Sequence, residues 1–282
     1  MSFYISDSEL EKFIEEDISP IDLTSYVLGI GDEKTTLSFR SRDKIVVCGT
    51  EEVESIFKKL GLETEFMMPS GVEVEEGVTF IKGVGKARDV HKAWRTSSKI
   101  LESFCGVATR TSHFVKAAKS ANSNVNIAAT RKNMPGTKRM ALKAIMAGGA
   151  YPHRIGLSET ILIFDEHIKL IGGLDKLIEK IPEIRLSSLE KKVAVEAHTY
   201  EDGIRLVKAG IDIIQLDKFK PEDLKKFVPE AKGINSKLVI VAAGNIREDN
   251  AEEYGATGVD ILATSALYFG KPADIKADIE KI

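Results

Sequence analysis

The chain has 282 residues, 43% of them hydrophobic and 29% charged, a composition that excludes both a disordered chain and a membrane-embedded one. Its 40 Lys and Arg residues against 43 Asp and Glu residues leave a net charge of −3, which excludes a global basic field for nucleic acid or an anionic membrane. Two cysteines, Cys48 and Cys105, are too few for a disulfide framework, and the sequence has no apolar run of signal-peptide or membrane-span type, so we expect a cytoplasmic protein.

The N-terminal part of the chain predicts a small domain of mixed helices and strands, marked by apolar patterning and glycine stops. The expected elements are a helix at Ser8–Glu16, strands at Thr35–Arg40 and Lys44–Cys48, a helix at Glu51–Leu60, a strand at Val78–Gly85 and a helix from about Asp89. No linker rich in Pro, Gly or Ser follows. We therefore expect the two halves of the chain to share a helix and to pack closely.

From about residue 104 to 270, short apolar runs alternate with helical patterns. The expected strands are Val125–Ala129, Thr160–Phe164, Lys192–Ala197, Ile211–Asp217, Leu238–Ala243 and Val259–Ala263. The expected helices between them include Thr137–Ala147, Thr199–Lys208, Pro221–Phe227 and Asp249–Tyr254. This alternation is typical of successive βα units and favours a parallel α/β barrel over an open sheet.

Polar side chains follow the ends of several of these strands. Because the C-terminal strand ends of a βα barrel converge on one mouth, we expect these side chains to become neighbours there. The cations are Arg131, Lys132, His153 and Arg154, with Lys138 and Arg139 just beyond, and the carboxylates are Glu196, Asp217 and Asp165. Arg and Lys hold phosphate oxygens, whereas carboxylates take Mg²⁺ or sugar hydroxyls. The set predicts a site for a phosphorylated sugar, although each charge taken alone is more typical of a solvated loop.

Two late strand ends have residues suited to presenting backbone N–H groups to a phosphate, with simple turns as the alternative. These are Ala243-Gly244-Asn245 and Thr264-Ser265. Earlier in the chain, a turn at Asn133–Gly136 precedes Thr137, a candidate helix cap. The five histidines lack the spacing of a local zinc site.

Several motifs, in consistent order over nearly the whole chain, resemble the quinolinate phosphoribosyltransferase family. They are Glu16-Asp17-Ile18 with Asp22-Leu-Thr24, Arg95-Thr96 leading to Gly106-Val-Ala-Thr109, Thr130-Arg-Lys-Asn-Met-Pro-Gly136, Gly148-Gly-Ala-Tyr-Pro-His-Arg154 with Gly156-Leu-Ser158, and Ala209-Gly-Ile-Asp212 leading to Leu216-Asp217. The resemblance implies an N-terminal open-faced α/β sandwich over residues 1–103 and a C-terminal incomplete parallel α/β barrel over 104–270. It also implies a tail, 271–282, that returns to the N-terminal domain.

The resemblance further implies a homodimer in which the partner's N-terminal domain completes each barrel mouth. By motif, Arg95 resembles the arginine donated across that interface. Arg131, Lys132, His153 and Arg154 resemble the cluster that holds the acid substrate and the phosphates, with Lys138 as a further substrate-binding candidate. Glu196 and Asp217 resemble the acids near the ribose and Mg²⁺. The implied donor is 5-phosphoribosyl diphosphate and the implied acceptor a nitrogen heterocycle.

One departure from the family pattern bears on the acceptor. The family usually has a Lys-Asp-Asn-His run where this chain has Phe164-Asp165-Glu166-His167, so an aromatic ring replaces a cation. Together with the Ala263–Leu267 segment, this pattern is more similar to the ModD subgroup, the pyrophosphorylases associated with molybdate transport genes. Losing a charge-assisted contact typically costs about 1.5–3 kcal/mol, whereas a flat ring can stack on a heterocycle. We expect an acceptor less charged than quinolinate.

Three functions stay open from the sequence. The first is phosphoribosyl transfer with a changed acceptor, and the second is the decarboxylating quinolinate reaction of NAD biosynthesis, which makes nicotinate mononucleotide. The third, from another class, is a non-catalytic binder of a phosphorylated metabolite or an oxyanion, linked to molybdate uptake.

Overall fold

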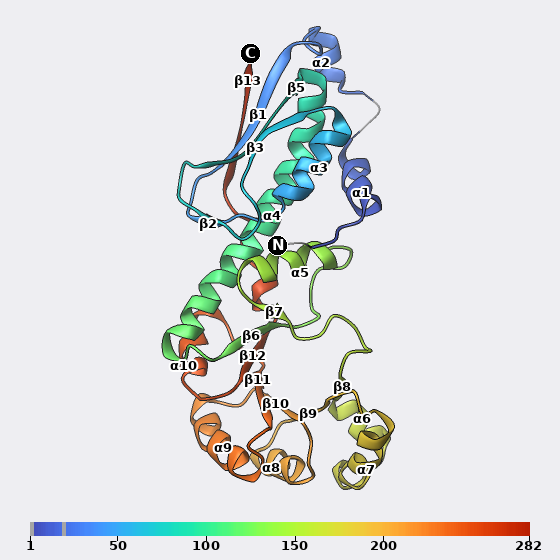
Figure 1. Ribbon diagram of the computed structural model, residues 1–282, viewed down its shortest axis with the longest axis vertical. Coiled ribbons are helices and arrows are strands. Elements are labelled where there is room, and N and C mark those ends of the chain that lie inside the picture. The colour runs from blue at the N-terminus through green and yellow to red at the C-terminus, as the bar shows by residue number, and fades with distance from the viewer. Residues whose placement is uncertain (1–2, 19–20) are drawn as a thin grey trace. The chain divides into compact units, whose positions relative to one another are not determined.

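Figure 1 shows the computed structural model of the protein, which describes residues 3–18 and 21–282. The chain forms two compact units, each assembled from separate stretches of sequence. The first unit contains residues up to 112, 133–149 and 267–282, and the second contains residues 113–132 and 150–266. The units therefore do not follow the linear boundaries drawn from the sequence at residues 103 and 270, since the segment 133–149 folds with the first unit.

The first unit is built on a four-stranded antiparallel sheet in the order β13-β1-β5-β3. Its strands are β1 (Lys34–Ser41), β3 (Glu63–Met67), β5 (Thr79–Lys86) and β13 (Ile275–Lys281). Two further short strands, β2 (Ile45–Val46) and β4 (Glu73–Val74), pair with each other. β13 pairs with β1 along its whole length, so the end of the chain belongs to this sheet.

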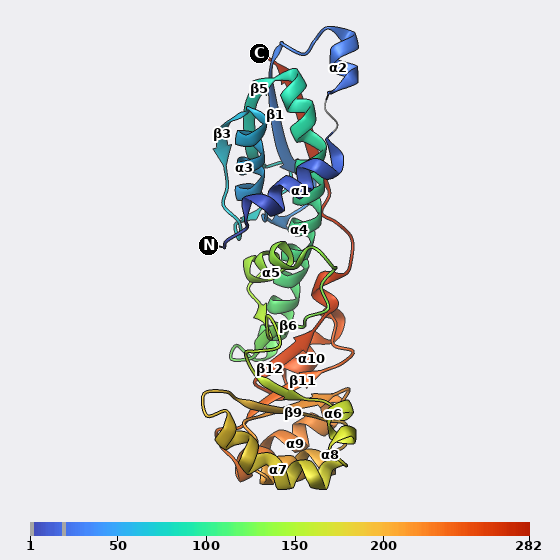
Figure 2. The ribbon, with the colours of Figure 1, turned by 90° about the vertical axis from the view of Figure 1, so that its right-hand side faces the viewer.

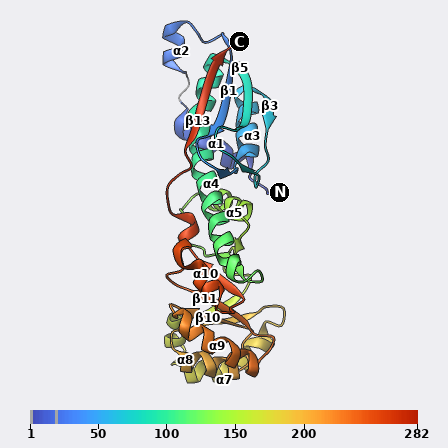
Figure 3. The same ribbon diagram turned by 90° about the vertical axis from the view of Figure 1, so that its left-hand side faces the viewer.

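The helices of the first unit are α1 (Asp7–Asp17), α2 (Leu23–Leu28), α3 (Thr50–Leu60), α5 (Lys138–Ala147) and the part of α4 (Ala87–Ala121) up to Ser112. Figures 2 and 3, taken from opposite sides, show α1 and α3 on one face of the sheet, whose strands are nearer the viewer in Figure 3. A Cβ atom added to Gly83 of β5 would lie 2.6 Å from the Phe57 ring of α3, so the helix packs directly on the sheet. This is the expected open-faced sandwich.

A buried charged cluster joins α5 to α3 in the first unit. The Lys143 ammonium is only 2% exposed and donates hydrogen bonds to Glu51 Oε2 at 2.8 Å and to Glu52 Oε2 at 2.5 Å. Ser70 also donates to Glu51, from both its backbone N–H and its hydroxyl group. Burial would raise the pKa of Glu51, but these donors outweigh it and lower the pKa to about 2. The ionised form of Glu51 therefore stabilises the fold.

The second unit is built on a seven-stranded, all-parallel sheet in the order β7-β6-β12-β11-β10-β9-β8. Its strands are β6 (Asn126–Ala129), β7 (Tyr151–Pro152), β8 (Ile161–Ile163), β9 (Val193–Ala197), β10 (Ile213–Asp217), β11 (Val239–Ala243) and β12 (Ile261–Thr264). β7 and β8 follow each other in the chain but lie at opposite edges of the sheet. The barrel is therefore open between them, as an incomplete α/β barrel requires.

The helices of the second unit follow the strands in βα order. They are α6 (Asp165–Leu170), α7 (Leu174–Ser187), α8 (Tyr200–Lys208), α9 (Pro221–Ile234) and α10 (Ala251–Gly255), with short 3₁₀ turns at Glu248–Asn250 and, crossing into the first unit, Ala266–Tyr268. The end of α4, from His113 on, also belongs to the second unit. Figures 1 and 2 show α8 and α9 side by side along one face of the sheet. They pack closely because Gly203 of α8 has no side chain to hold off the Phe227 ring of α9.

All six strands predicted for the barrel are confirmed, each beginning one or two residues later than predicted, and β12 ends one residue later, at Thr264. Several details of the prediction are wrong. The strand expected at Lys44–Cys48 is only Ile45–Val46, and the helix expected at Asp249–Tyr254 is Ala251–Gly255, preceded by a 3₁₀ turn. The helix expected to end at Phe227 continues through Pro229 to Ile234. Thr137 precedes α5 but does not cap it, because its hydroxyl donates to the Met134 carbonyl instead.

Candidate active site

The C-terminal ends of the barrel strands surround a cavity of about 670 Å³ in the second unit. Most of the side chains singled out in the sequence line it, although they come from different strand ends. They are Arg131, Lys132, His153, Arg154, Phe164, Glu196, Asp217, Ala243, Gly244, Asn245, Thr264 and Ser265. Arg95, on α4, and Lys138, at the start of α5, belong to the first unit and do not line this cavity.

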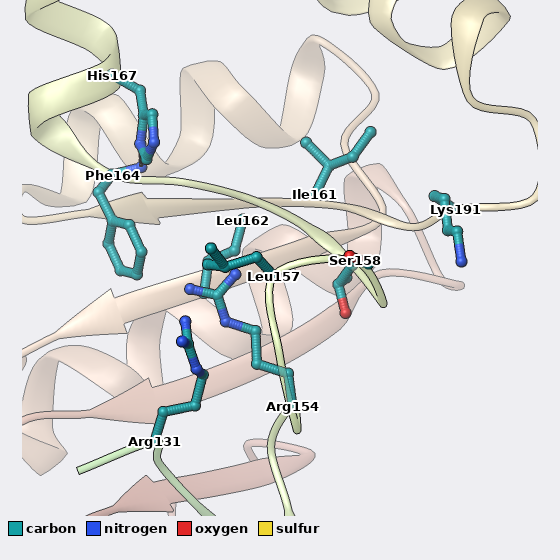
Figure 4. Close-up of a pocket in the computed structure, with 10 residues that line it drawn as sticks. Arg131, Arg154, Leu157, Ser158, Ile161, Leu162, Phe164, His167 and Lys191 are labelled. Atoms are coloured by element: carbon teal, nitrogen blue, oxygen red, sulfur yellow. Dashed lines mark hydrogen bonds between the residues drawn. The ribbon is translucent and has the colours of Figure 1, made fainter. Parts of the chain in front are cut away.

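Cations gather where β6 and β7 end. Arg131 and Lys132 follow β6, and His153 and Arg154 follow β7, its neighbour in the sheet. Figure 4 shows the Arg131 and Arg154 guanidinium groups rising toward Leu162 and the Phe164 ring. Burial, together with the nearby Arg131 charge, lowers the pKa of Arg154, and burial and Arg154 lower that of His153. Two guanidinium groups held together against their repulsion favour an anion between them.

Acidic and amide side chains occupy the ends of β9 and β10. Gln215 is paired in register with Glu196, and its amide Nε2 donates to Glu196 Oε2 at 2.5 Å. Burial raises the pKa of Glu196 and the nearby Asp217 charge adds to the rise, whereas the bond from Gln215 offsets part of it. Gln215 was not singled out in the sequence. The alternation of side chains along a strand could have identified Gln215 as a site residue, because it places Gln215 on the same face as Asp217.

His198 lies among three of these carboxylates. Its Nε2 atom is 3.3 Å from Asp165 Oδ2 and 3.4 Å from Glu196 Oε1, and its Nδ1 atom is 3.7 Å from Asp217 Oδ2. The imidazole thus lies between Asp165, at the start of α6, and the acids of the neighbouring strands β9 and β10. Glu196 and Asp217 line the cavity together with Glu166, whereas Asp165 does not.

The acids suit a metal ion that is shared with a substrate. Within residues 3–18 and 21–282, no three His, Cys, Asp or Glu side chains converge to enclose a metal ion by themselves. Glu196 and Asp217, with side chains 14% and 18% exposed, nevertheless both present oxygens to the cavity. Mg²⁺ is typically held by one or two carboxylates together with water and substrate phosphate oxygens. The residues present fit such an ion.

The ends of β11 and β12 form the part of the cavity wall expected to meet phosphate. Gly244 has φ +83°, and an added Cβ would lie 2.6 Å from Asp217 Oδ1 and 2.9 Å from the Lys218 backbone nitrogen. The Thr264 hydroxyl donates to the Ile246 carbonyl at 2.8 Å and accepts from the Ala266 N–H at 3.0 Å, which fixes the next turn. The backbone N–H groups of Gly244, Asn245 and Ser265 donate to no other described residue. They are therefore available to an anion.

Two further cations line this cavity that the sequence did not single out, Lys218 and Arg247. Lys218 follows Asp217 in a left-handed conformation, with φ 61°, and its N–H donates to the Ala243 carbonyl at 2.7 Å. A positive φ at a non-glycine residue is uncommon and has no signature in this sequence.

A second cavity, of about 650 Å³, shares one wall with the first (Figure 4). The shared wall is made by Arg131, Arg154, Leu162 and Phe164. Beyond it, the lining is Leu157, Ser158, Thr160, Ile161, His167 and Lys191. No carboxylate is among these described residues, so the acids line the first cavity and the second is apolar and cationic.

Comparison with known proteins accounts for both units. Residues 22–105 match the domain described as "Quinolinate phosphoribosyl transferase, N-terminal domain", and residues 107–278 match its C-terminal domain. The chain belongs to the quinolinate phosphoribosyltransferase family. As a member of this family it is an enzyme, a phosphoribosyltransferase, and the fold class expected from the sequence is confirmed.

Relatives of this family member include two kinds of pyrophosphorylase. A protein of Pasteurella multocida named as a ModD pyrophosphorylase is 34% identical over 99% of each chain. A Methanocaldococcus jannaschii protein named as a nicotinate-nucleotide pyrophosphorylase (carboxylating) is 30% identical over 96% of this chain and 95% of its own. The solved nicotinate-nucleotide pyrophosphorylase of Francisella tularensis has a TM-score of 0.88, with 25% identity and 98% coverage of each chain.

None of the helices that the structure describes combines the length and the apolar character of a membrane span.

Proposed function

We propose that this phosphoribosyltransferase moves the 5-phosphoribosyl group from its diphosphate to an aromatic nitrogen heterocycle other than quinolinate, with release of diphosphate. The observation that supports this most is the chemical division of the barrel mouth. One cavity combines Glu196 and Asp217 with cations and free backbone N–H groups, as an activated pentose requires. The adjoining cavity is free of described carboxylates and has an aromatic wall, as a flat anionic acceptor requires.

In this reaction the bond between C1 of the ribose and the diphosphate oxygen breaks, and its electron pair leaves with the diphosphate. The lone pair of the acceptor nitrogen forms the new bond to C1, through a transition state of oxocarbenium character. Glu196 and Asp217 line the site where the ribose and its positive charge would lie. Lys132 and Arg154 would meet the negative charge of the phosphates, and losing one well-placed group of this kind typically costs about 10²–10³ in rate.

Mg²⁺ would be held by Glu196 and Asp217 together with oxygens of the donor. When bound, it supplies positive charge that stabilises the leaving diphosphate. The protein's own contribution is to present both carboxylates to the same cavity. The hydrogen bond that Gln215 donates favours the ionised form of Glu196 and offsets part of the burial that raises its pKa.

The loops after β11 and β12 would bind phosphate through their backbone. Gly244 allows the chain to approach Asp217 closely, which brings the phosphate site and an acid of the ribose site together. The free N–H groups of Gly244, Asn245 and Ser265 would then bind the same donor molecule as Asp217. Binding the phosphates and the ribose of one donor molecule at the same time favours transfer, because it fixes the position of the ribose C1 atom for the acceptor nitrogen.

We also propose a homodimer in which Arg95 reaches the barrel mouth of the other subunit. Arg95 is exposed on α4, with its guanidinium carbon 4.9 Å from the centre of the Trp94 ring. Mixing an inactive Arg95→Ala protein with an inactive Asp217→Asn protein should restore part of the activity if the site is shared. Mixtures that stay inactive would contradict a shared site.

The experiment that tests the proposed function is an assay of diphosphate release. The protein is supplied with 5-phosphoribosyl diphosphate, Mg²⁺ and a panel of nitrogen heterocycles that includes quinolinate. We expect diphosphate release with a heterocycle other than quinolinate. Robust CO₂ and nicotinate mononucleotide formation from quinolinate would instead assign the decarboxylating reaction of NAD biosynthesis. Tight ligand binding without any release would indicate the non-catalytic binder linked to molybdate uptake.

A further inference from the structure

The cavity of about 670 Å³ lined by Glu196 and Asp217 is called the donor cavity, and the adjoining one of about 650 Å³ the acceptor cavity. The wall between them carries both guanidinium groups and apolar side chains. Arg131 and Arg154 lie in this wall, and the Glu159 carboxylate is close enough to attract Arg154 without lining either cavity. The Phe164 ring lies in the same wall, with its centroid 5.7 Å from the Arg154 guanidinium carbon. The buried Leu162 side chain also belongs to this wall. A ligand that lies against this wall contacts two guanidinium groups and a hydrocarbon surface at the same time.

Phe164 is held in place by its neighbours. It precedes α6, and its backbone N–H donates to His167 Nδ1 at 3.0 Å. The two rings are stacked, with centroids 6.0 Å apart and an angle of 23° between their planes. Because contacts with both His167 and Arg154 hold the ring, Phe164 offers a fixed flat surface to a ligand.

We propose that Phe164 determines acceptor specificity, and that the acceptor is a planar aromatic nitrogen heterocycle with a single carboxylate, which remains in the product. This inference rests on the proposed function and names its substrate class. The carboxylate binds between Arg131 and Arg154, and the ring lies against Phe164 and Leu162. A second carboxylate on the ring, directed at the Phe164 side, would lose its hydration without gaining a cation of its own, because Arg154 already pairs with the first carboxylate.

The chemistry balances without loss of the carboxylate. The ring nitrogen donates its lone pair to C1 of the pentose as the C1–O bond to diphosphate breaks, and the diphosphate takes the electron pair. The product is a ribonucleotide with a cationic ring nitrogen and an intact carboxylate. No proton, CO₂ or external oxidant is involved in the step.

Lys191 is the other non-histidine cation of the acceptor cavity, and it gives a matched control. Figure 4 shows it at the far side of the cavity from Phe164, with its ammonium directed away from the two guanidinium groups. If a dicarboxylate used Lys191 as its second partner, Lys191→Ala would weaken dicarboxylate binding. In the present proposal that substitution leaves the preference between mono- and dicarboxylates unchanged.

The test compares binding of pyridine-3-carboxylate and pyridine-2,3-dicarboxylate to the full-length protein by calorimetry, in the presence of diphosphate and Mg²⁺. The variants are Phe164→Lys, which adds a cation, Phe164→Leu, which keeps the apolar character but removes the aromatic ring, and Lys191→Ala. Wild type should prefer the monocarboxylate. Phe164→Lys should tighten dicarboxylate binding by about ten- to 100-fold, the range of a charge-assisted contact. Phe164→Leu should weaken monocarboxylate binding several-fold, since its stacking surface is lost.

A dicarboxylate preference in wild type, unchanged by Phe164→Lys, would overturn the inference, as would failure of wild type to bind the monocarboxylate. Mass spectrometry of the product supplies a second readout, because a product that has lost CO₂ also overturns it. These failures differ from failure of the proposed function. Release of diphosphate with a heterocycle that carries no carboxylate would refute only this inference. Release with the dicarboxylate alone would refute the acceptor of the proposed function as well, and no release with any heterocycle would refute the transferase reaction.

Discussion

Replacing Gly244 with Ala tests whether the end of β11 is packed against Asp217. The residue has φ +83°, in the left-handed region that costs an L-residue about 1–2 kcal/mol. The added methyl group would also lie 2.6 Å from Asp217 Oδ1 and 2.9 Å from the backbone nitrogen of Lys218. The second of these atoms cannot rotate away, and overpacking of this kind typically costs about 1–3 kcal/mol more. We expect a total loss of about 2–5 kcal/mol in the free energy of unfolding.

Gly77 provides the matched control for this substitution. It has φ +81°, and no atom lies within 4 Å of the position that its Cβ would take. Gly77→Ala should therefore have only the cost of the left-handed conformation, about 1–2 kcal/mol, and should keep full activity. Gly244→Ala should in addition reduce kcat/KM by about 10²-fold, because displacement of Asp217 by about 1 Å disturbs the ribose site.

The two variants are compared by guanidinium chloride unfolding, followed by circular dichroism, and by the rate of diphosphate release. Equal unfolding midpoints together with equal rates would refute the reasoning. That result would mean that the ends of β10 and β11 are not in contact at Gly244.

Other substitutions and treatments have equally direct outcomes. Lys143→Met, which leaves two buried carboxylates without their cation, should lower the free energy of unfolding by about 3–5 kcal/mol. The pKa of Glu51 is about 2 against an ordinary value of 4.5, so its contribution to stability should be complete above about pH 4.5 and be lost as the pH falls toward 2. Gln215→Met removes the donor to Glu196, so kcat/KM should fall about tenfold or more and the pKa of Glu196 should rise. Removal of Mg²⁺ with a chelator should stop diphosphate release, and added Mg²⁺ should restore it.

The predictions for Glu51, Lys143 and Gln215 each have a control. Glu51→Gln should flatten the pH dependence of unfolding between pH 4.5 and 2, and an unchanged profile would mean that Glu51 does not carry it. Lys143→Met combined with Glu51→Gln and Glu52→Gln should recover part of the lost stability, since no unpaired charge then remains. For Gln215→Met, an unchanged unfolding midpoint is expected. A kcat/KM equal to wild type would remove Gln215 from the site.

The barrel could be predicted from the sequence because its strands are buried on both faces. Continuous apolar runs such as Ile211–Asp217 and Leu238–Ala243 differ clearly from the helical patterns between them. Since parallel strands in a barrel direct their C-terminal ends to one mouth, the residues after each run could be assigned to one site. Arg131, Glu196 and Asp217, far apart in the chain, line one cavity for this reason.

The domain to which residues 133–149 belong and the division of the barrel mouth into two cavities could not be predicted, because both depend on contacts between residues distant in the sequence. Residues 133–149 fold with the first unit, through contacts such as the ion pairs of Lys143 with Glu51 and Glu52, which are distant in the chain. Lys138 followed the cationic strand end closely in sequence, yet it belongs to that same segment. The division between an acid-lined and an acid-free cavity was also not predictable. It depends on how Leu157 and Phe164, on separate segments, are arranged around the same space.

In the proposed function, one barrel mouth binds an activated pentose by its phosphates and its ribose at the same time. A crystal structure of the full-length protein with Mg²⁺ and 5-phosphoribosyl diphosphate tests this most directly. We predict phosphate oxygens on the backbone N–H groups of Gly244, Asn245 and Ser265, and the ribose beside Glu196 and Asp217. Clear density for the donor at another site, with this mouth occupied by solvent alone, would contradict the account.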